Sequence, residues 1–188
     1  MIIGICAKMG SGKDYIANNY IIPILKKYNR EYIKLSFADQ LKVLVMQKYN
    51  INYNDVYIQK TKHTRSLLQQ EGCSFRSTNP NAWIDYHQAW STVLAQNNPD
   101  VFIITSDVRY QNEFDYIQKN GGLLIKINAK SRNEDRINQE KLSIEQINHH
   151  SECDLDNIPE SEFDLVIDNE PGTDLTRLND EIIKLLQL

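Results

Sequence analysis

A strand, a glycine-containing turn and a helix follow one another in the first 27 residues, and this order constrains the fold most. The apolar, β-branched run Ile2–Cys6 predicts a buried strand. The turn Ala7-Lys-Met-Gly-Ser-Gly-Lys-Asp14 comes next, and apolar residues then recur at helical spacing to Lys27 despite Pro23. Such a turn aims backbone N–H groups at one anion, and the helix N-terminus and Lys13 add positive charge. We therefore predict a phosphate-binding loop.

The loop departs from the common pattern G-x-x-x-x-G-K-[ST] at two positions. Ala7 replaces the first glycine, and Asp14 replaces the hydroxyl residue that normally contacts Mg²⁺. A carboxylate also holds Mg²⁺, directly or through water, and an acid suits the first turn of a helix. The alternative is a glycine turn that binds nothing, but Gly10, Gly12 and Lys13 directly after a strand favour phosphate binding.

The rest of the chain alternates between strand and helix patterns. Further strands are predicted at residues 31–36, 101–106, 123–128 and 163–168. Helices are predicted at 37–46, 64–72 with Gly72 as the stop, 82–96, 110–119 and 173–188, while 49–62 and 76–81 read as irregular. Alternation of this kind predicts a parallel sheet covered on both faces. The loop and the residues after Ser36 and Ser106 should then share one edge.

Size and composition are those of a single globular domain, 1–188. A net charge of −4 and a pI near 5.6 argue against a general nucleic-acid binder. No apolar run approaches a membrane span, so we expect no membrane partner. Cys6, Cys73 and Cys153 are far apart, which predicts reduced thiols and a cytoplasmic protein.

Two charged residues follow the apolar run 103–106. Asp107 ends that run as the acid of a Walker B motif does, where it would hold Mg²⁺ or orient an acceptor. Arg109 is a candidate phosphate clamp, because guanidinium groups bind oxyanions bidentately. The alternatives are a turn-forming Asp and a surface Arg.

Other candidate residues lie between the predicted strands. Arg65 and Arg76 could bind an acceptor phosphate or be solvated, and Trp83 could stack on a flat ring or belong to the core. The polar segment 129–150 is a candidate mobile lid. Its Arg132 and Arg136 share one helix face and could reach transferring phosphates, the alternative being a solvated helix. The sequence His149-His150-Ser-Glu152 is interpreted as a structural turn rather than a metal site.

Together these motifs resemble the phage-type deoxynucleoside monophosphate kinases, a group of phosphate-loop small-molecule kinases. The shared features, in order, are Gly10-Ser-Gly-Lys-Asp14, Phe37-Ala-Asp-Gln-Leu-Lys42, Thr64-Arg-Ser-Leu-Leu-Gln-Gln-Glu-Gly72, Trp83, Asp107-Val-Arg109 with Asn112-Glu113, Gly121-Gly122 and His150-Ser-Glu152. The resemblance covers nearly the whole chain, and Asp14 is usual in this group.

The resemblance implies a three-layer P-loop kinase fold: a parallel five-stranded sheet with helices on both faces and a small mobile lid at about 129–150. It implies ATP-dependent phosphorylation of a deoxynucleoside monophosphate to the diphosphate. ATP and Mg²⁺ would be held by Lys8, Gly10, Ser11, Gly12, Lys13 and Asp14, with Asp14 and Asp107 at the metal. The acceptor site would comprise Leu41, Lys42, Arg65, Gly72, Trp83, Asp107, Arg109 and Glu113. The catalytic set would be Lys13, Asp107, Arg109, Arg132 and Arg136.

Two alternatives stay open. The related phosphomevalonate kinases share the Gly-Lys-Asp loop and a stretch like Ser151–Asn157, so a short acid phosphate competes as the acceptor. A non-catalytic nucleotide-binding switch could use the same loop, although Arg65, Trp83 and Arg109 would then be unnecessary. The partner expected is a small-molecule nucleotide, not nucleic acid, and the chain would be a monomer or a homodimer.

Overall fold

The computed structural model describes residues 1–59, 61–140 and 149–188, with the side chains of Arg136 and Glu140 left out. The chain divides into two compact units. Unit 1 comprises residues 1–34 and 98–188, and unit 2 comprises residues 35–97. The expectation of one domain over 1–188 stays a prediction.

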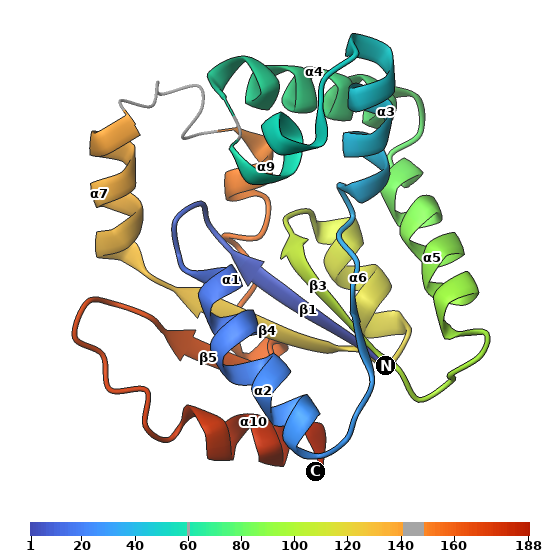
Figure 1. Ribbon diagram of the computed structural model, residues 1–188. Coiled ribbons are helices and arrows are strands. Elements are labelled where there is room, and N and C mark those ends of the chain that lie inside the picture. The colour runs from blue at the N-terminus through green and yellow to red at the C-terminus, as the bar shows by residue number, and fades with distance from the viewer. Residues whose placement is uncertain (60, 141–148) are drawn as a thin grey trace. The chain divides into compact units, whose positions relative to one another are not determined.

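Unit 1 contains a five-stranded parallel sheet, as predicted (Figure 1). Its strands are β1 (Ile2–Ala7), β2 (Tyr32–Lys34), β3 (Phe102–Val108), β4 (Leu123–Asn128) and β5 (Leu165–Asp168), in the order β2-β3-β1-β4-β5. The central strand β1 pairs with β3 on one side and β4 on the other. The turn after β1 therefore leaves the middle of the sheet, between the ends of its two neighbours.

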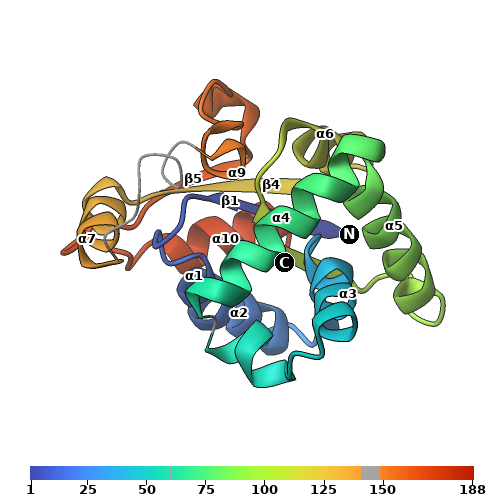
Figure 2. The same ribbon diagram turned by 90° about the horizontal axis from the view of Figure 1, so that it is seen from above.

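Helices cover both faces of this sheet (Figure 2). On one face lie α1 (Lys13–Ile16), η1 (Ala17–Ile21), α2 (Ile22–Lys27) and α10 (Leu178–Leu186), and on the other lies α6 (Gln111–Lys119). Ile3 and Ile5 are buried in the core with the first group. Gly4 faces the opposite way and comes close to Ile117 of α6. Alternating residues of one buried strand thus serve both faces.

The helix after the loop runs past Pro23 through a local change of geometry. Residues Ala17–Ile21 form a π-helical turn, and Pro23 lies in the first turn of α2 directly after it. A proline has no N–H for the helix ladder, and a π-turn is a known way to absorb such an interruption. The predicted helix from Tyr15 to Lys27 is therefore continuous in direction but not uniform.

Among its described residues, unit 1 also contains three further helical segments: α7 (Lys130–Glu140), α9 (His150–Cys153) and η3 (Glu160–Glu162). The predicted lid at 129–150 includes α7, while residues 141–148 lie outside the described residues. Mobility of that segment stays a prediction. The three cysteines all lie in the described part of the chain and form no disulfide, and burial raises the pKa of the Cys6 thiol.

Unit 2 is helical and consists of α3 (Asp39–Tyr49), η2 (Asn54–Ile58), α4 (Lys62–Thr78) and α5 (Ala82–Ala95). Its buried residues include Leu41, Val45, Val56, Leu67 and Trp83. In the part of the chain that the structure covers, no helix combines the length and apolar character needed to cross a membrane.

The prediction that Gly72 ends its helix is wrong. Gly72 lies inside α4, which begins after Thr61, whose hydroxyl accepts a hydrogen bond from the N–H of Thr64 at 3.1 Å. A Cβ at position 72 would lie 3.2 Å from the Cδ2 of Leu41. Gly72 therefore allows α3 to approach α4 closely, a packing role that outweighs the low helix propensity of glycine.

Candidate functional site

The predicted phosphate loop has the backbone of an anion-binding turn. Gly10 and Gly12 both adopt left-handed conformations, with φ of 88° and 84°. Helix α1 begins at Lys13, so the unpaired N–H groups of its first turn follow the loop directly. A Cβ at position 12 would lie 2.4 Å from the Nδ2 of Asn169. Neither the conformation nor the space at Gly12 admits another residue without strain.

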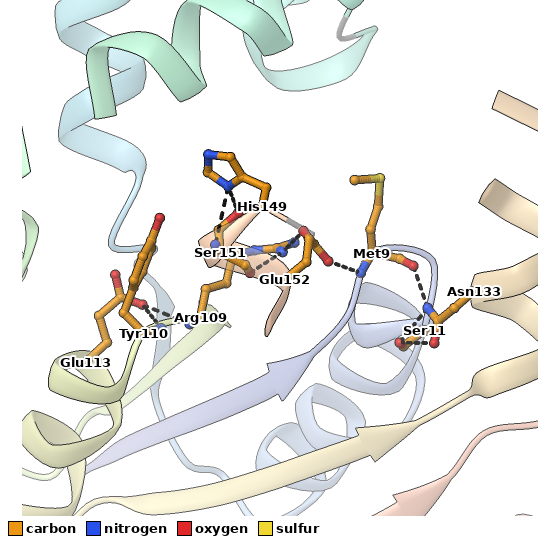
Figure 3. Close-up of polar contacts among 9 residues, drawn as sticks. All are labelled: Met9, Ser11, Arg109, Tyr110, Glu113, Asn133, His149, Ser151 and Glu152. Atoms are coloured by element: carbon orange, nitrogen blue, oxygen red, sulfur yellow. Dashed lines mark hydrogen bonds and ion pairs between the residues drawn. The ribbon is translucent and has the colours of Figure 1, made fainter. Parts of the chain in front are cut away.

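Three side chains from distant parts of unit 1 hold this loop, and Figure 3 shows two of them, Glu152 and Asn133. The Glu152 carboxylate accepts a hydrogen bond from the N–H of Met9 at 2.9 Å. The Asn133 amide donates to the carbonyl of Met9 and, at 3.1 Å, to the hydroxyl of Ser11. The buried Asn169 amide donates to the carbonyl of Ser11 at 2.9 Å. The loop is thus pre-shaped by polar contacts to α7, α9 and the end of β5.

Sequence reasoning missed Asn133 and Asn169, and it noted Glu152 only as part of a turn and a shared motif. One signal for Asn169 was available, because it follows directly after the last strand, at the edge where ligands bind in parallel sheets. Asn133 carries no comparable signal within its polar helix.

The loop cations and acids lie close together. The Lys13 Nζ and Asp14 Oδ2 form an ion pair at 2.8 Å, and the Asp14 side chain is 63% exposed. The Ser106 hydroxyl lies 3.5 Å from the other Asp14 oxygen, which brings the loop to the end of β3 as predicted. Lys8 pairs instead with Asp156 at 2.8 Å.

The number of carboxylates near the loop bears on whether Mg²⁺ could bind there. Among residues 1–59, 61–140 and 149–188, no group of three or more acidic, His or Cys side chains could hold a metal ion. Mg²⁺ in kinases is typically held by one or two carboxylates, with water and phosphate oxygens completing its shell. The exposed Asp14 in the first turn of α1 is a carboxylate of this kind, and Asp107 is partly buried near the end of β3. Their role at a metal stays a prediction.

Arg109 is held at the end of β3 by both its backbone and its side chain (Figure 3). The buried Glu113 carboxylate accepts from the N–H groups of Arg109 at 2.8 Å and Tyr110 at 3.2 Å. The Arg109 guanidinium forms an ion pair with Glu152 and donates to the carbonyl of Ser151 at 3.1 Å. In this arrangement Glu113 caps α6, while its predicted role in reading the acceptor stays a prediction.

The two predicted lid arginines differ in what the structure describes. The Arg132 Nε donates to the backbone carbonyl of Asn169 at 2.6 Å, so this side chain ties α7 to the segment after β5. The Arg136 side chain lies outside the described residues. A role for either one at transferring phosphates stays a prediction.

A cavity of about 520 Å³ opens beside the loop within unit 1. Its walls include Lys8, Met9, Arg109, Asn133 and Glu152, with apolar side chains from β4 and its surroundings. This volume is in the range of small-molecule sites, in which a few polar groups orient a ligand against apolar walls.

The remaining acceptor candidates lie in unit 2. Lys42 pairs with Asp39 at 2.7 Å and lies over the Tyr57 ring, 4.6 Å from its centroid. Burial, with the Asp39 charge, raises the pKa of Tyr57 to about 12. Leu41 packs at Gly72, and Arg65 is partly buried in α4.

Trp83 is a core residue of unit 2. It is 1% exposed and packs between Phe75 and Tyr86, with ring centroids 5.2 and 6.1 Å away. Its buried indole N–H has no hydrogen-bond partner among the described residues. A base cannot stack on a ring covered in this way unless unit 2 opens. The stacking role of Trp83 stays a prediction. Truncating this side chain would not test it, because the loss of a core residue would also destabilise unit 2.

The chain is similar in sequence to a viral protein. No model of a protein family matches the chain. The chain is 31% identical over 147 residues to an Acanthamoeba polyphaga mimivirus protein described as "Putative deoxynucleotide monophosphate kinase", a match covering 68% of this chain and 73% of the relative.

Solved structures with a similar fold include two shikimate kinases. The shikimate kinase from Bacteroides thetaiotaomicron has 13% identity and a TM-score of 0.43, covering 100% of this chain and 99% of its own. The shikimate kinase from Aquifex aeolicus vf5 has 12% identity and a TM-score of 0.45, covering 100% and 96%.

A parallel sheet in the order β2-β3-β1-β4-β5, with a glycine-lysine loop after its central strand, is the architecture of the P-loop kinase fold. The similarity to the mimivirus protein covers most of both chains. The chain belongs to the deoxynucleotide monophosphate kinase family.

Proposed function

We propose that the protein transfers the terminal phosphoryl group of ATP to a deoxynucleoside monophosphate, forming the diphosphate. The observation that carries the proposal is the position of Arg109 beside the phosphate loop, joined to it through Glu152. A protein that only binds ATP needs the loop but no second phosphate-binding cation nearby. A kinase with a phosphorylated acceptor needs both.

On the donor side, the backbone N–H groups of the loop and the Lys13 ammonium would bind the ATP phosphates. Asp14 and Asp107 would hold Mg²⁺, which supplies charge neutralisation when bound. Lys13 already lies beside Asp14, so phosphate oxygens would compete with that carboxylate for the ammonium.

On the acceptor side, Arg109 would bind the single phosphate of the monophosphate through its guanidinium. Leu41, Lys42, Arg65, Gly72 and Trp83 of unit 2 are assigned to the acceptor by resemblance to the family. The protein would act by positioning and charge stabilisation, because phosphoryl transfer needs little covalent chemistry from the protein.

A coupled assay for ADP release tests this function. Purified protein is supplied with ATP, Mg²⁺ and each of the four common deoxynucleoside monophosphates in turn, with 5-phosphomevalonate as the competing acceptor. We expect turnover with at least one monophosphate and none with 5-phosphomevalonate. Activity on 5-phosphomevalonate alone would overturn the nucleotide acceptor. Tight ATP binding without turnover on any acceptor would point to a nucleotide-binding switch.

A further inference from the structure

Glu152 contacts both of the groups that are proposed above to bind phosphates. One oxygen of its carboxylate accepts from the N–H of Met9 in the phosphate loop, and the other pairs with the guanidinium of Arg109 (Figure 3). The Glu152 side chain is 12% exposed and that of Arg109 is 22% exposed. A carboxylate removed from water to this extent is stable only with such partners, so this link is firmly held.

The rest of the Arg109 guanidinium is left for another ligand. Within the described residues, its hydrogen bonds all start from Nη1, to Ser151 and Glu152. A guanidinium has five N–H donors, three of them on Nη2 and Nε. An arginine anchored through one nitrogen can present the remaining edge to a phosphate bidentately. The pairing with Glu152 therefore orients Arg109 without using up its capacity to bind an anion.

The segment that carries Glu152 is itself fixed to the start of α6. The Asp154 carboxylate accepts from the N–H of Gln111 at 2.8 Å, and the His150 ring stacks on Tyr110 with centroids 5.9 Å apart. The His149 ring accepts from the N–H of Ser151 at 3.3 Å. Glu152 thus projects from a segment braced against the element that holds the Arg109 backbone.

We propose that Glu152 is a positioning residue that sets the spacing between the ATP phosphate loop and the acceptor-phosphate clamp Arg109. The proposal deepens the function proposed above and rests on it. In-line phosphoryl transfer requires donor and acceptor at a fixed separation, and a misplacement of about 1 Å can cost about 10²-fold in rate. One carboxylate bonded to both anchors is a direct way to fix that separation.

A different interpretation of Glu152 predicts the opposite effect on nucleotide binding. If Glu152 imitated a phosphate and kept the loop closed to nucleotide, its removal would strengthen nucleotide binding. If Glu152 positions Arg109, replacing it by Gln should lower kcat and raise the KM of the acceptor. Binding of ATP should change little, because the Gln side-chain oxygen still accepts from the N–H of Met9. Calorimetric titration with ATP therefore separates the two.

The test uses Glu152→Gln, which keeps the shape but loses the charge that pairs with Arg109, and Glu162→Gln as a matched control on the exposed turn η3. We expect Glu152→Gln to lower kcat with the best acceptor by about 10²-fold, with the control unchanged. Combined with Arg109→Ala, Glu152→Gln should cause no further loss, because it acts through that arginine. The proposal would be overturned if the double variant had a lower kcat than Arg109→Ala alone. It would also be overturned if Glu152→Gln bound ATP about tenfold more tightly.

A readout that needs no turnover separates this proposal from the proposed function. Nitrogen-15 NMR of the arginine side chains should show slow guanidinium rotation for Arg109 in the wild type and faster rotation in Glu152→Gln, with Arg109→Lys providing the assignment. A freely rotating Arg109 in the wild type would overturn the proposal even if the protein is an active kinase. A restrained Arg109 in a protein inactive on every acceptor would instead overturn the proposed function.

Discussion

Lys13 places a positive charge directly after the phosphate loop, at the start of α1. Its ammonium is paired with the exposed carboxylate of Asp14, next to the first turn of α1. An exposed pair of this kind contributes little to stability, since solvent screens it. The value of Lys13 should therefore lie in contacts to phosphates rather than in the fold.

We expect Lys13→Met to lower kcat by at least about 10³-fold, by analogy with other cations at transferring phosphates, with a nearly unchanged unfolding temperature. Lys119→Met, at the exposed end of α6, is the matched control and should be silent. The measurement is steady-state ADP release together with a thermal unfolding curve. Turnover of the Lys13 variant within about tenfold of wild type would refute the phosphate-loop assignment.

Asp107 is proposed to hold Mg²⁺, so its charge should matter for turnover rather than for the fold. Asp107→Asn removes one charge and keeps the shape, so Mg²⁺-dependent turnover should fall by about 10²-fold or more while the fold persists. Titration of activity with Mg²⁺ should show a weaker apparent affinity for the metal. Asp180→Asn, in the exposed first turn of α10, controls for the loss of a negative charge. An unchanged Mg²⁺ dependence in Asp107→Asn would remove this residue from the metal site.

At the scale of elements, α3 and α4 are joined by a polar link as well as by Leu41 and Gly72. The Glu71 carboxylate of α4 accepts from the Lys48 ammonium at 2.7 Å and from the Tyr49 hydroxyl at 2.5 Å. These hydrogen bonds, that of Lys48 first, hold the pKa of Glu71 below its ordinary value of 4.5. The same contacts raise the pKa of Lys48 and of Tyr49.

The sign of the Glu71 shift predicts a dependence on acid. A carboxyl whose pKa is lowered by folding stabilises the fold fully above its unfolded pKa, and that contribution is lost as the pH falls through the folded pKa. Wild type should therefore lose unfolding temperature more steeply below about pH 4.5 than Glu71→Gln does. Glu31→Gln, an exposed change of the same charge, is the control. Parallel curves for wild type and Glu71→Gln would show that the link carries no stability.

At the scale of the whole molecule, the residues proposed to bind ATP and most of those proposed to bind the acceptor belong to different units. The donor residues of the loop, with Asp107 and Arg109, belong to unit 1, and Leu41, Lys42, Arg65, Gly72 and Trp83 belong to unit 2. Because Trp83 lies in the core of unit 2, its removal would cost about 3–5 kcal/mol in folding stability and would obscure any effect on the acceptor. Ligand effects on each unit are a cleaner test.

Hydrogen exchange measured by mass spectrometry should assign each substrate to its unit. We expect ATP with Mg²⁺ to slow exchange in the loop and α1 of unit 1, and a monophosphate substrate to slow it in α3 and α4 of unit 2. Lys13→Met should reduce the first effect and keep the second. A monophosphate substrate that protects no amide within residues 35–97 would move the acceptor site out of unit 2.

The sequence by itself determined the parallel sheet and the phosphate loop after its first strand. It also determined that this loop approaches the end of β3. These features follow from local apolar runs, glycines and strand ends, whose signals are contained in a few consecutive residues. Family membership likewise rests on sequence, through the mimivirus relative.

Only the tertiary structure decided which side chains hold the loop, and where a helix ends when packing opposes propensity. Asn133, Glu152 and Asn169 contact the loop across more than a hundred residues of chain, and Gly72 continues its helix because Leu41 packs against it. Polar pairing of this kind depends on where whole elements dock, and the burial of Trp83 depends on the rings of Phe75 and Tyr86 around it. Apart from the position of Asn169 directly after the last strand, no local pattern carries that information, because each contact forms only once the elements are packed.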